Sequence, residues 1–188
     1  MSSSEWIAAS TLHVMASRNP TLTLCYLPHL DYDLQRHGPD LGHPAVQKSL
    51  RDIDALCGRM FEAAERDGRE IVVVSEYGIT RVTDAVHINR ALRAAGLIRV
   101  RDEMGRDVLD PGASRAFAVA DHQLAHVYVR EPGDIPAVRD VVAGLPGVES
   151  VLDEDGKRQA GLDHPRSGEL VAISGADRWF SYYYWLDD

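Results

Sequence analysis

The chain has 188 residues, of which 45% are hydrophobic and 26% charged, which is typical of a globular α/β domain with a real core. Its formal net charge of −9 excludes nonspecific nucleic-acid binding, because no basic stripe is available to neutralise phosphates. An anionic substrate would therefore need a local cation or metal at its site.

Targeting signals and disulfides are not expected. No apolar run approaches the roughly 20 residues of a membrane span, and the N-terminus lacks the basic and apolar regions of a signal peptide. The two cysteines, Cys25 and Cys57, fall in a predicted strand and a predicted helix. Such thiols are typical of a reducing compartment. We therefore expect a cytoplasmic protein with no membrane partner, and the sequence sets no oligomeric state.

The first 86 residues predict a helix followed by a βαβ unit. Residues 3–18 read as the helix, and the uncharged run 21–26 reads as a strand. A long amphipathic helix then extends from Pro44 to near Gly68, because apolar residues recur at steps of three and four. The run 70–75 holds four apolar residues in succession, as expected for a strand that is covered on both faces.

Polar side chains follow both predicted strands at their carboxyl ends, where open α/β sheets bind their ligands. The loop after the first strand and the turn after the second hold Asp31, Asp33, Gln35, His37, Glu76 and Tyr77. Strands joined by a βαβ crossover are parallel, and neighbouring strands lie about 4.8 Å apart. If these two strands are neighbours, Asp31 and Glu76 lie within reach of one metal ion.

Shorter segments follow in the second half of the chain. We expect a helix over 87–95, a hairpin within 97–109, strands over 115–120 and 125–130, a helix over 135–143, and strands over 147–152 and 168–174. Pieces of this length predict a small α+β subdomain inserted into a larger sheet. The predicted organisation is a core portion (1–86), a cap (87–160) and a return to the core sheet (161–188).

The polar motifs resemble those of the type I phosphodiesterase and nucleotide pyrophosphatase family of the alkaline phosphatase superfamily. In that family an aspartate precedes a histidine by four residues and Gly-Pro by seven and eight. Asp31 and Gly38-Pro39 match this spacing, with Gln35 in place of the histidine. The run Ser-Glu-Tyr-Gly-Ile over 75–79 is similar to the family's Ser-Asp-His-Gly-Met, and residues 164–174 resemble its bacterial branch.

The resemblance implies a three-layer α/β sandwich of alkaline-phosphatase-like type, present here in part, with a small α+β cap. It implies hydrolysis of a phosphodiester or pyrophosphate bond in a small phosphorylated or nucleotide-like substrate. It also implies a two-metal site, usually zinc, and a threonine or serine nucleophile. In the family the nucleophile lies far before the first motif, so we expect it to be missing here, and the catalytic residue stays unassigned. The alternative is a non-catalytic ligand-binding module with a degenerate metal site.

The metal ligands implied by the resemblance are Asp31, Gln35, Glu76 and Tyr77. Zinc prefers nitrogen or sulfur ligands, so this oxygen-rich set makes magnesium or manganese an alternative. A shifted pair, Asp33 and His37, has the same spacing and competes with Asp31 and Gln35. Each aspartate has a structural alternative in turn hydrogen bonds. The neighbouring histidines at 29 and 43 are expected to be loop residues.

The predicted substrate-binding residues are His164, Arg166 and His122. Arg166 is suited to bidentate contact with a phosphate, with a surface salt bridge as its alternative. His122 and His126 are four residues apart, but the flanking patterns favour a strand and its bend over a helix. The aromatic stretch 179–185 is expected to be core or interface more than a nucleobase platform.

Overall fold

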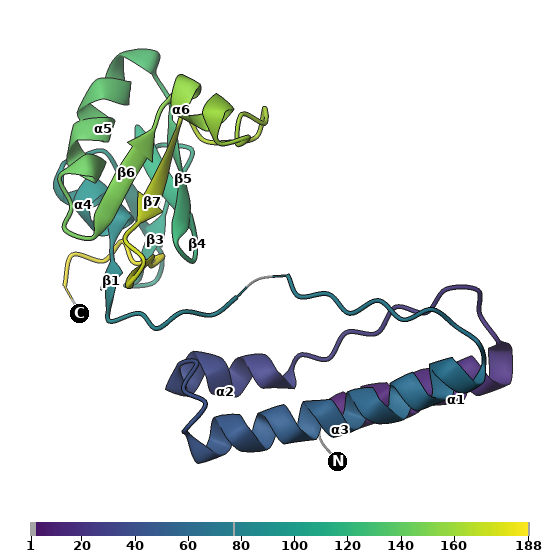
Figure 1. Ribbon diagram of the computed structural model, residues 1–188. Helices are drawn as coiled ribbons and strands as arrows, with labels where there is room; N and C mark the ends of the chain where they lie inside the picture. The colour runs from purple at the N-terminus through teal and green to yellow at the C-terminus, as the bar shows by residue number, and fades with distance from the viewer. Residues whose placement is uncertain (1–2, 77, 188) are drawn as a thin grey trace. The chain divides into compact units, whose positions relative to one another are not determined.

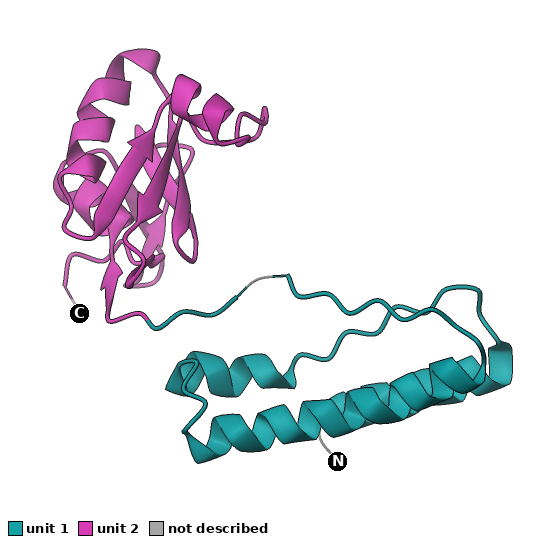
Figure 2. Ribbon diagram, in the orientation of Figure 1, with its two compact units in different colours: residues 1–81 teal, residues 82–188 magenta. Residues whose placement is uncertain are grey.

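The computed structural model describes residues 3–76 and 78–187. The chain forms two compact units, unit 1 over residues 1–81 and unit 2 over residues 82–188 (Figure 2). Unit 2 therefore contains both the segment expected as a cap and the segment expected to return to the core sheet. No helix within the described residues is long and apolar enough to cross a membrane.

The described part of unit 1 contains three helices (Figure 1). They are α1 (Ser3–Arg18), α2 (His29–His37) and α3 (Pro44–Arg66). Helix α3 contacts both of the others. Ala8 and Met15 on α1 are buried, as are Val46, Leu56 and Ala63 on the amphipathic face of α3. The predicted helices over 3–18 and from Pro44 onward are thus confirmed.

Two predictions for unit 1 are wrong. Residues 29–37 form helix α2 where a loop was expected, because no glycine or proline interrupts the run between Pro28 and Gly38. Residues 21–26 and 70–75 are extended, but no ladder forms on either run in the described part of the chain. A strand needs a hydrogen-bonding neighbour, and described residues supply none to these runs.

Unit 2 is built on a four-stranded antiparallel sheet with the order β4-β5-β7-β6. Its strands are β4 (Ala116–Asp121), β5 (Leu124–Val129), β6 (Val148–Leu152) and β7 (Leu170–Ser174). Buried and less buried residues alternate along β4 and β5, as they do when one face of a sheet is covered. Helices α4 (Ile88–Ala94) and α5 (Ile135–Ala143) pack against the sheet.

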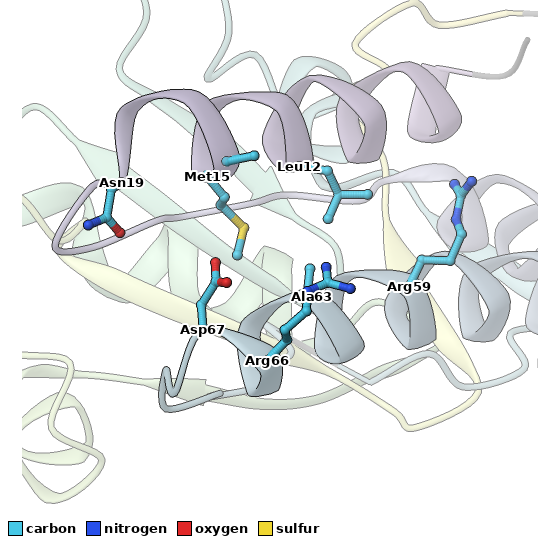
Figure 3. A pocket seen from close by; sticks show the side chains of 8 residues that line it. Leu12, Met15, Asn19, Arg59, Ala63, Arg66 and Asp67 are labelled. Carbon is cyan, nitrogen blue, oxygen red and sulfur yellow. The ribbon is translucent and has the colours of Figure 1, made fainter.

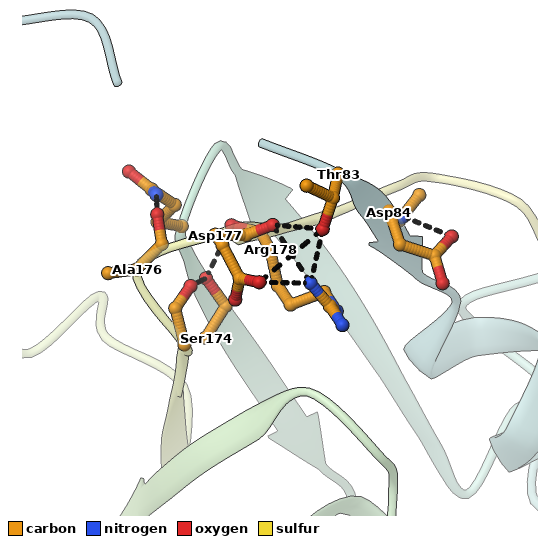
Figure 4. Close-up of polar contacts among 9 residues, drawn as sticks. Thr83, Asp84, Ser174, Ala176, Asp177 and Arg178 are labelled. Atoms are coloured by element: carbon orange, nitrogen blue, oxygen red, sulfur yellow. Dashed lines mark hydrogen bonds and ion pairs between the residues drawn. The ribbon is translucent and has the colours of Figure 1, made fainter. Parts of the chain in front are cut away.

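Shorter elements complete unit 2. A hairpin joins β2 (Val100–Asp102) and β3 (Asp107–Leu109), η1 (Pro132–Asp134) precedes α5, α6 (Glu154–Gln159) follows β6, and β1 (Asp84–Val86) pairs in parallel with β8 (Arg178–Phe180). Figure 4 shows the polar contacts beside β1 and β8. Thr83 N–H donates to the Asp177 carbonyl at 2.8 Å, and Arg178 Nη1 donates to Thr83 Oγ1. These bonds connect two segments almost 100 residues apart.

The core of unit 2 is one apolar cluster. Leu92, Val127, Val138, Leu170 and Phe180 are at most 1% exposed and belong to one apolar cluster. Asn89 is a buried polar side chain near this core, and its amide both donates and accepts a hydrogen bond. Its Nδ2 donates to the Ala118 carbonyl at 2.8 Å, and its Oδ1 accepts from the Ala118 N–H at 2.7 Å. This exchange ties α4 to β4.

Candidate functional site

Asp31 and Gln35 lie one turn apart on the same face of α2. Gln35 Nε2 donates to Asp31 Oδ2 at 2.6 Å. The other carboxylate oxygen, Oδ1, is buried and has no hydrogen-bond partner among the described residues. Because buried polar atoms are nearly always satisfied, an orphaned carboxylate oxygen indicates a missing cation or hydrogen-bond donor.

Two histidines near this pair in the sequence also have a buried ring nitrogen with no hydrogen-bond partner among the described residues, Nδ1 of His29 and Nδ1 of His43. His29 Nε2 lies 3.3 Å from the Ser49 carbonyl, and the rings of His37 and His43 stack with centroids 4.0 Å apart. The sequence analysis assigned His29 and His43 to a loop. Their closeness to Asp31 in the sequence could have marked them as site candidates. The burial of their ring nitrogens became apparent only from the packing of α2 on α3.

The rival pair, Asp33 and His37, has other partners. Asp33 accepts a hydrogen bond from the Ser49 hydroxyl of α3, and His37 stacks on His43. Asp33 therefore fastens α2 to α3. Among the described residues, Oδ1 of Asp31 has no hydrogen-bond partner, whereas the carboxylate of Asp33 is hydrogen-bonded to Ser49.

The second motif is only partly visible. Glu76 is exposed at the end of the extended run, and no described hydrogen bond or ion pair joins it to Asp31 or Gln35. Tyr77 lies outside the described residues. The chain that follows returns to the end of α2, since a Cβ atom added to Gly38 would lie 3.8 Å from Arg81 Nη2. Gly38 has a φ of 74°, which an L side chain rarely adopts.

The donor set at Asp31 fits a hard cation in part. A free carboxylate oxygen is the kind of ligand that magnesium, manganese and calcium accept. Within residues 3–76 and 78–187, no group of three or more His, Cys, Asp and Glu side chains is placed to hold a metal ion. The described residues thus provide a first oxygen ligand and not a complete coordination set.

A depression of unit 1 lies elsewhere on α3. It has a volume of about 730 Å³, and Figure 3 shows Leu12 and Met15 of α1 facing Ala63 of α3, with Arg59 and Arg66 beside them. These α3 residues belong to its last two turns, whereas Ser49, next to Asp33, is in its first two turns. At 1.5 Å per residue the two places are on the order of 15–25 Å apart along the helix. The depression is therefore separate from the Asp31 motif.

In unit 2, the predicted substrate-binding residues His164 and Arg166 share one loop. His164 Nδ1 accepts from the Arg166 N–H at 3.1 Å, and the Tyr128 hydroxyl donates to the Arg166 carbonyl at 2.9 Å. No ion pair of Arg166 occurs among the described residues, so the alternative of a surface salt bridge is not seen here. The loop backbone is held while its two basic side chains stay exposed.

The far end of this loop is fixed by close packing at Gly168. A Cβ atom added there would lie 2.6 Å from the Val127 carbonyl oxygen, closer than real Cβ contacts. Lys157 is 5% exposed, and its Nζ donates to the Gly168 carbonyl at 2.8 Å. Nδ1 of His126 lies 3.3 Å from the Gly168 nitrogen, within hydrogen-bond distance. The loop is thereby rigidly attached to β5.

A depression of about 420 Å³ adjoins the loop. Its charged lining consists of Asp153, Glu154, Lys157, Asp163, His164 and Glu169. The Gly156 N–H, and then Arg139, hold the pKa of Asp153 below its ordinary value. With four carboxylates against one lysine and one histidine, the lining favours a neutral or cationic group over a phosphate.

His122 lies in the turn between β4 and β5, with a φ of 56° and an imidazole 3.7 Å from the Asp121 carboxylate. His126 lies within β5. The expectation of a strand and its bend is therefore confirmed, and the two histidines do not share a helix face.

Sequence reasoning missed a pairing of His87 with Ser181. Nδ1 of His87 is hydrogen-bonded to the hydroxyl of Ser181, and the same hydroxyl accepts from the Tyr183 N–H at 3.2 Å. Ser181 is 5% exposed, so its hydroxyl is turned away from solvent. It anchors the aromatic stretch, in which the Tyr184 and Trp185 rings stack with centroids 4.5 Å apart. The two residues are 94 positions apart, and no local pattern signals them.

Comparison with known proteins identifies the family. A sequence model described as type I phosphodiesterase / nucleotide pyrophosphatase matches residues 1–188. No curated protein sequence gives a significant match. The chain is similar in structure to murine ectonucleotide pyrophosphatase / phosphodiesterase 5, solved as an inactive variant with AMP, at 19% identity and a TM-score of 0.69; the match covers 99% of this chain and 46% of that one.

A bacterial protein is also similar. Phosphonoacetate hydrolase from Sinorhizobium meliloti 1021, solved with phosphonoacetate, matches at 18% identity with a TM-score of 0.64, covering 96% of this chain and 43% of that one. At such identities the likeness shows the fold, an α/β fold of alkaline-phosphatase-like type. The chain spans less than half the length of these solved structures.

Proposed function

Because the chain belongs to the type I phosphodiesterase / nucleotide pyrophosphatase family, we propose that it serves the hydrolysis of phosphodiester or pyrophosphate bonds in small phosphorylated substrates. Its solved neighbours are complexes with AMP and with phosphonoacetate, two small ligands that carry a phosphorus-centred anion. A ligand of this class suits a chain of net charge −9 only if a cation is supplied at the site.

The orphaned oxygen of Asp31 carries the proposal. Asp31 and Glu76 are the proposed metal ligands of this chain, with magnesium or manganese favoured over zinc by their oxygen atoms. A bound divalent metal would polarise the phosphoryl group and neutralise charge that develops on it. Gln35 orients the Asp31 carboxylate through its 2.6 Å hydrogen bond. Tyr77 is proposed to hydrogen-bond the substrate, and the attacking nucleophile is not assigned. Substrate binding by His164, Arg166 and His122 of unit 2 stays a separate prediction from the sequence.

A second candidate function is a non-catalytic module that binds a small phosphorylated ligand. One observation favours it: the side-chain amide of Gln35 already satisfies Oδ2 of Asp31. In this reading Gln35 and the family fold preserve a binding surface after the metal ligands have changed. The cytoplasmic location of the protein stays a prediction from its sequence.

Titration calorimetry with manganese, magnesium and zinc separates the two functions. We expect the chain to bind manganese or magnesium at one site, and the Asp31→Ala variant to lose at least tenfold in affinity. Asp33→Asn is the matched control, because it alters the neighbouring carboxylate that is bonded to Ser49. Its metal affinity should stay within twofold of the parent.

The nucleotide arm uses AMP as the probe, with and without the metal. Binding of AMP that requires the metal supports the hydrolase. Binding of AMP that is equal in both conditions and unchanged in Asp31→Ala supports the non-catalytic module. Loss of metal affinity in Asp33→Asn but not in Asp31→Ala would contradict the assignment of Asp31 and favour the shifted pair.

A further inference from the structure

The side chain of Arg81 lies against the end of the helix that carries the Asp31 motif. Three atoms of its guanidinium group, Nε, Cζ and Nη2, are 3.8–3.9 Å from a Cβ atom built on Gly38. Gly38 is the residue that directly follows α2, the helix of Asp31 and Gln35. A permanently charged group is therefore held beside the candidate site, although the sequence places it 43 residues after Gly38.

This guanidinium is not engaged by another part of the described chain. Within residues 3–76 and 78–187, Arg81 is exposed and makes neither an ion pair nor a hydrogen bond. Two other cations of unit 1 are engaged: Lys48 pairs with Asp52, and Arg69 donates to the Pro20 carbonyl at 2.6 Å. The N–H donors of Arg81 are thus available for an anion that the chain itself does not supply.

The position of Arg81 matches the face of α2 on which the motif lies. Asp31, Gln35 and Gly38 have the spacing i, i+4, i+7, so their Cα atoms share one face of the helix. This face begins with the carboxylate whose Oδ1 has no described partner, and it ends at the glycine against which Arg81 rests.

The separation of the two ends suits one phosphoryl group between them. Seven residues of helix span about 10 Å. A cation lies about 2.1 Å from a carboxylate oxygen, and a guanidinium N–H donor lies about 2.9 Å from the oxygen that accepts its hydrogen bond. With the width of a phosphoryl group between these two contacts, the whole arrangement has a length on the order of 10 Å.

A structural role for Arg81 at the end of α2 is the alternative. Cations stabilise helix C-termini through the helix dipole and by donating to the last carbonyl groups. The last turn of α2 already contains Arg36 and His37. No hydrogen bond from Arg81 to a carbonyl of α2 occurs among the described residues. The geometry therefore favours an external anion as the partner of Arg81.

We propose that Arg81 is a phosphate-binding residue of the Asp31 site. Its guanidinium donates to two oxygen atoms of a phosphoryl group, which is the bidentate contact that arginine favours. A cation held by Asp31 would contact the same group from the other side. The proposal deepens the proposed function and rests on it for the choice of a phosphorylated ligand. In a chain of net charge −9, Arg81 supplies a fixed part of the positive charge that such a ligand needs.

Titration calorimetry of the full chain tests this role, with AMP as the probe and adenosine as its twin without a phosphate. Both are measured with and without manganese. Arg81→Gln should lower the affinity for AMP at least tenfold and should not change the binding of adenosine. Arg81→Lys keeps the charge and loses the bidentate contact, so its affinity for AMP should fall between those of the parent and of Arg81→Gln.

Arg36→Gln is the matched control. Arg36 is an exposed cation at the same end of α2, but it lies five residues after Asp31 and therefore about 140° around the helix from it. Its affinity for AMP should stay within twofold of the parent. In Arg81→Gln the affinity for manganese, measured without AMP, should not fall, and the thermal unfolding temperature should stay that of the parent. A purely structural role would lower that temperature instead.

The outcomes separate Arg81 from the proposed hydrolysis. Binding of AMP that needs Arg81 but not manganese would support the role of Arg81 and contradict a metal-dependent hydrolase. Manganese binding at Asp31 with an unchanged AMP affinity in Arg81→Gln would overturn the role of Arg81 alone. The role is also overturned by an equal loss of affinity in Arg36→Gln, by an equal loss for adenosine, or by a parent chain that binds no AMP in either condition.

Discussion

Two runs of similar composition have opposite environments in the two units. Leu170, Val171 and Ala172 of β7 lie between β5 and β6 and are 0% exposed. Val72, Val73 and Val74 of unit 1 are at least 72% exposed. Both runs have the side chains of a buried strand. The difference teaches that strand propensity is realised only where neighbouring strands complete the backbone bonds, since tertiary context overrides local preference.

The comparison also separates two sources of stability. Unit 2 buries an apolar cluster against its hydrogen-bonded sheet, and the removal of these side chains from water stabilises the unit. Unit 1 buries the interface between its helices and leaves the side chains of its extended runs in water. Truncating an apolar side chain should therefore destabilise unit 2 strongly, whereas the same change in the extended runs of unit 1 should have little effect.

The sharpest contrast uses one residue type at both places. Leu92→Ala in unit 2 removes a side chain that is 0% exposed, and should lower the free energy of unfolding by about 2–5 kcal/mol. Leu24→Ala in unit 1 removes one that is 86% exposed, and should change it by less than about 0.5 kcal/mol. Denaturant unfolding followed by circular dichroism and by tryptophan fluorescence measures both. A loss at Leu24 equal to that at Leu92 would break the comparison.

Gly168 gives the next largest effect, because it tests how tightly unit 2 is packed. In Gly168→Ala the new Cβ would meet the Val127 backbone at 2.6–2.8 Å, so β5 or the loop must move. Overpacking of this kind costs about 1–3 kcal/mol of unfolding free energy. Gly133→Ala is the control, since nothing lies within 4 Å of its added Cβ. Equal thermal unfolding temperatures for the two variants would contradict the close approach.

Asn89 tests the buried polar bond of unit 2. Asn89→Ala leaves the N–H and C=O of Ala118 without their side-chain partner, and should cost about 1–3 kcal/mol. Gln47→Ala in unit 1 is a matched amide loss at an exposed place, where Nε2 donates to the Leu41 carbonyl and water can replace it. It should change unfolding by less than about 0.5 kcal/mol. An equal loss of unfolding free energy in both variants would show that burial of Asn89 is not the cause of its effect.

Much of the fold can be predicted from the sequence, because most of its helices and strands follow the local periodicity of apolar residues. The apolar repeat of α3 and the strand patterns of β4 to β7 predict elements that the structure contains. The polar stretch from His29 to His37 misleads, since aspartates and histidines that are common in loops here lie on a helix. The two unpaired runs could not be foreseen, because pairing depends on distant chain and not on the runs themselves.

The candidate site divides in the same way. The spacing of Asp31 and Gln35 could be read from the sequence, and their hydrogen bond follows from the helix that carries them. The spacing left Asp31 and Asp33 as rivals, and only the contact of Asp33 with Ser49 distinguishes their environments. Whether Glu76 joins Asp31 stays a prediction. The bond between His87 and Ser181 needed the fold, because it joins chain segments that no motif connects.

The smallest effect concerns Cys57 and shows what partial burial does in unit 1. Desolvation by burial, assisted by the nearby charges of Asp54 and Cys25, raises the pKa of the Cys57 thiol above its ordinary value of 9.0. Above that value the unfolded chain releases the proton first, so the folded state binds more protons and the stability of unit 1 falls as pH rises. Thermal unfolding between neutral and alkaline pH should show this fall, and Cys57→Ala should reduce it. Since the thiol is only partly buried, the change should be small beside that of Leu92→Ala; an alkaline loss that is unaltered in Cys57→Ala would assign it to another group.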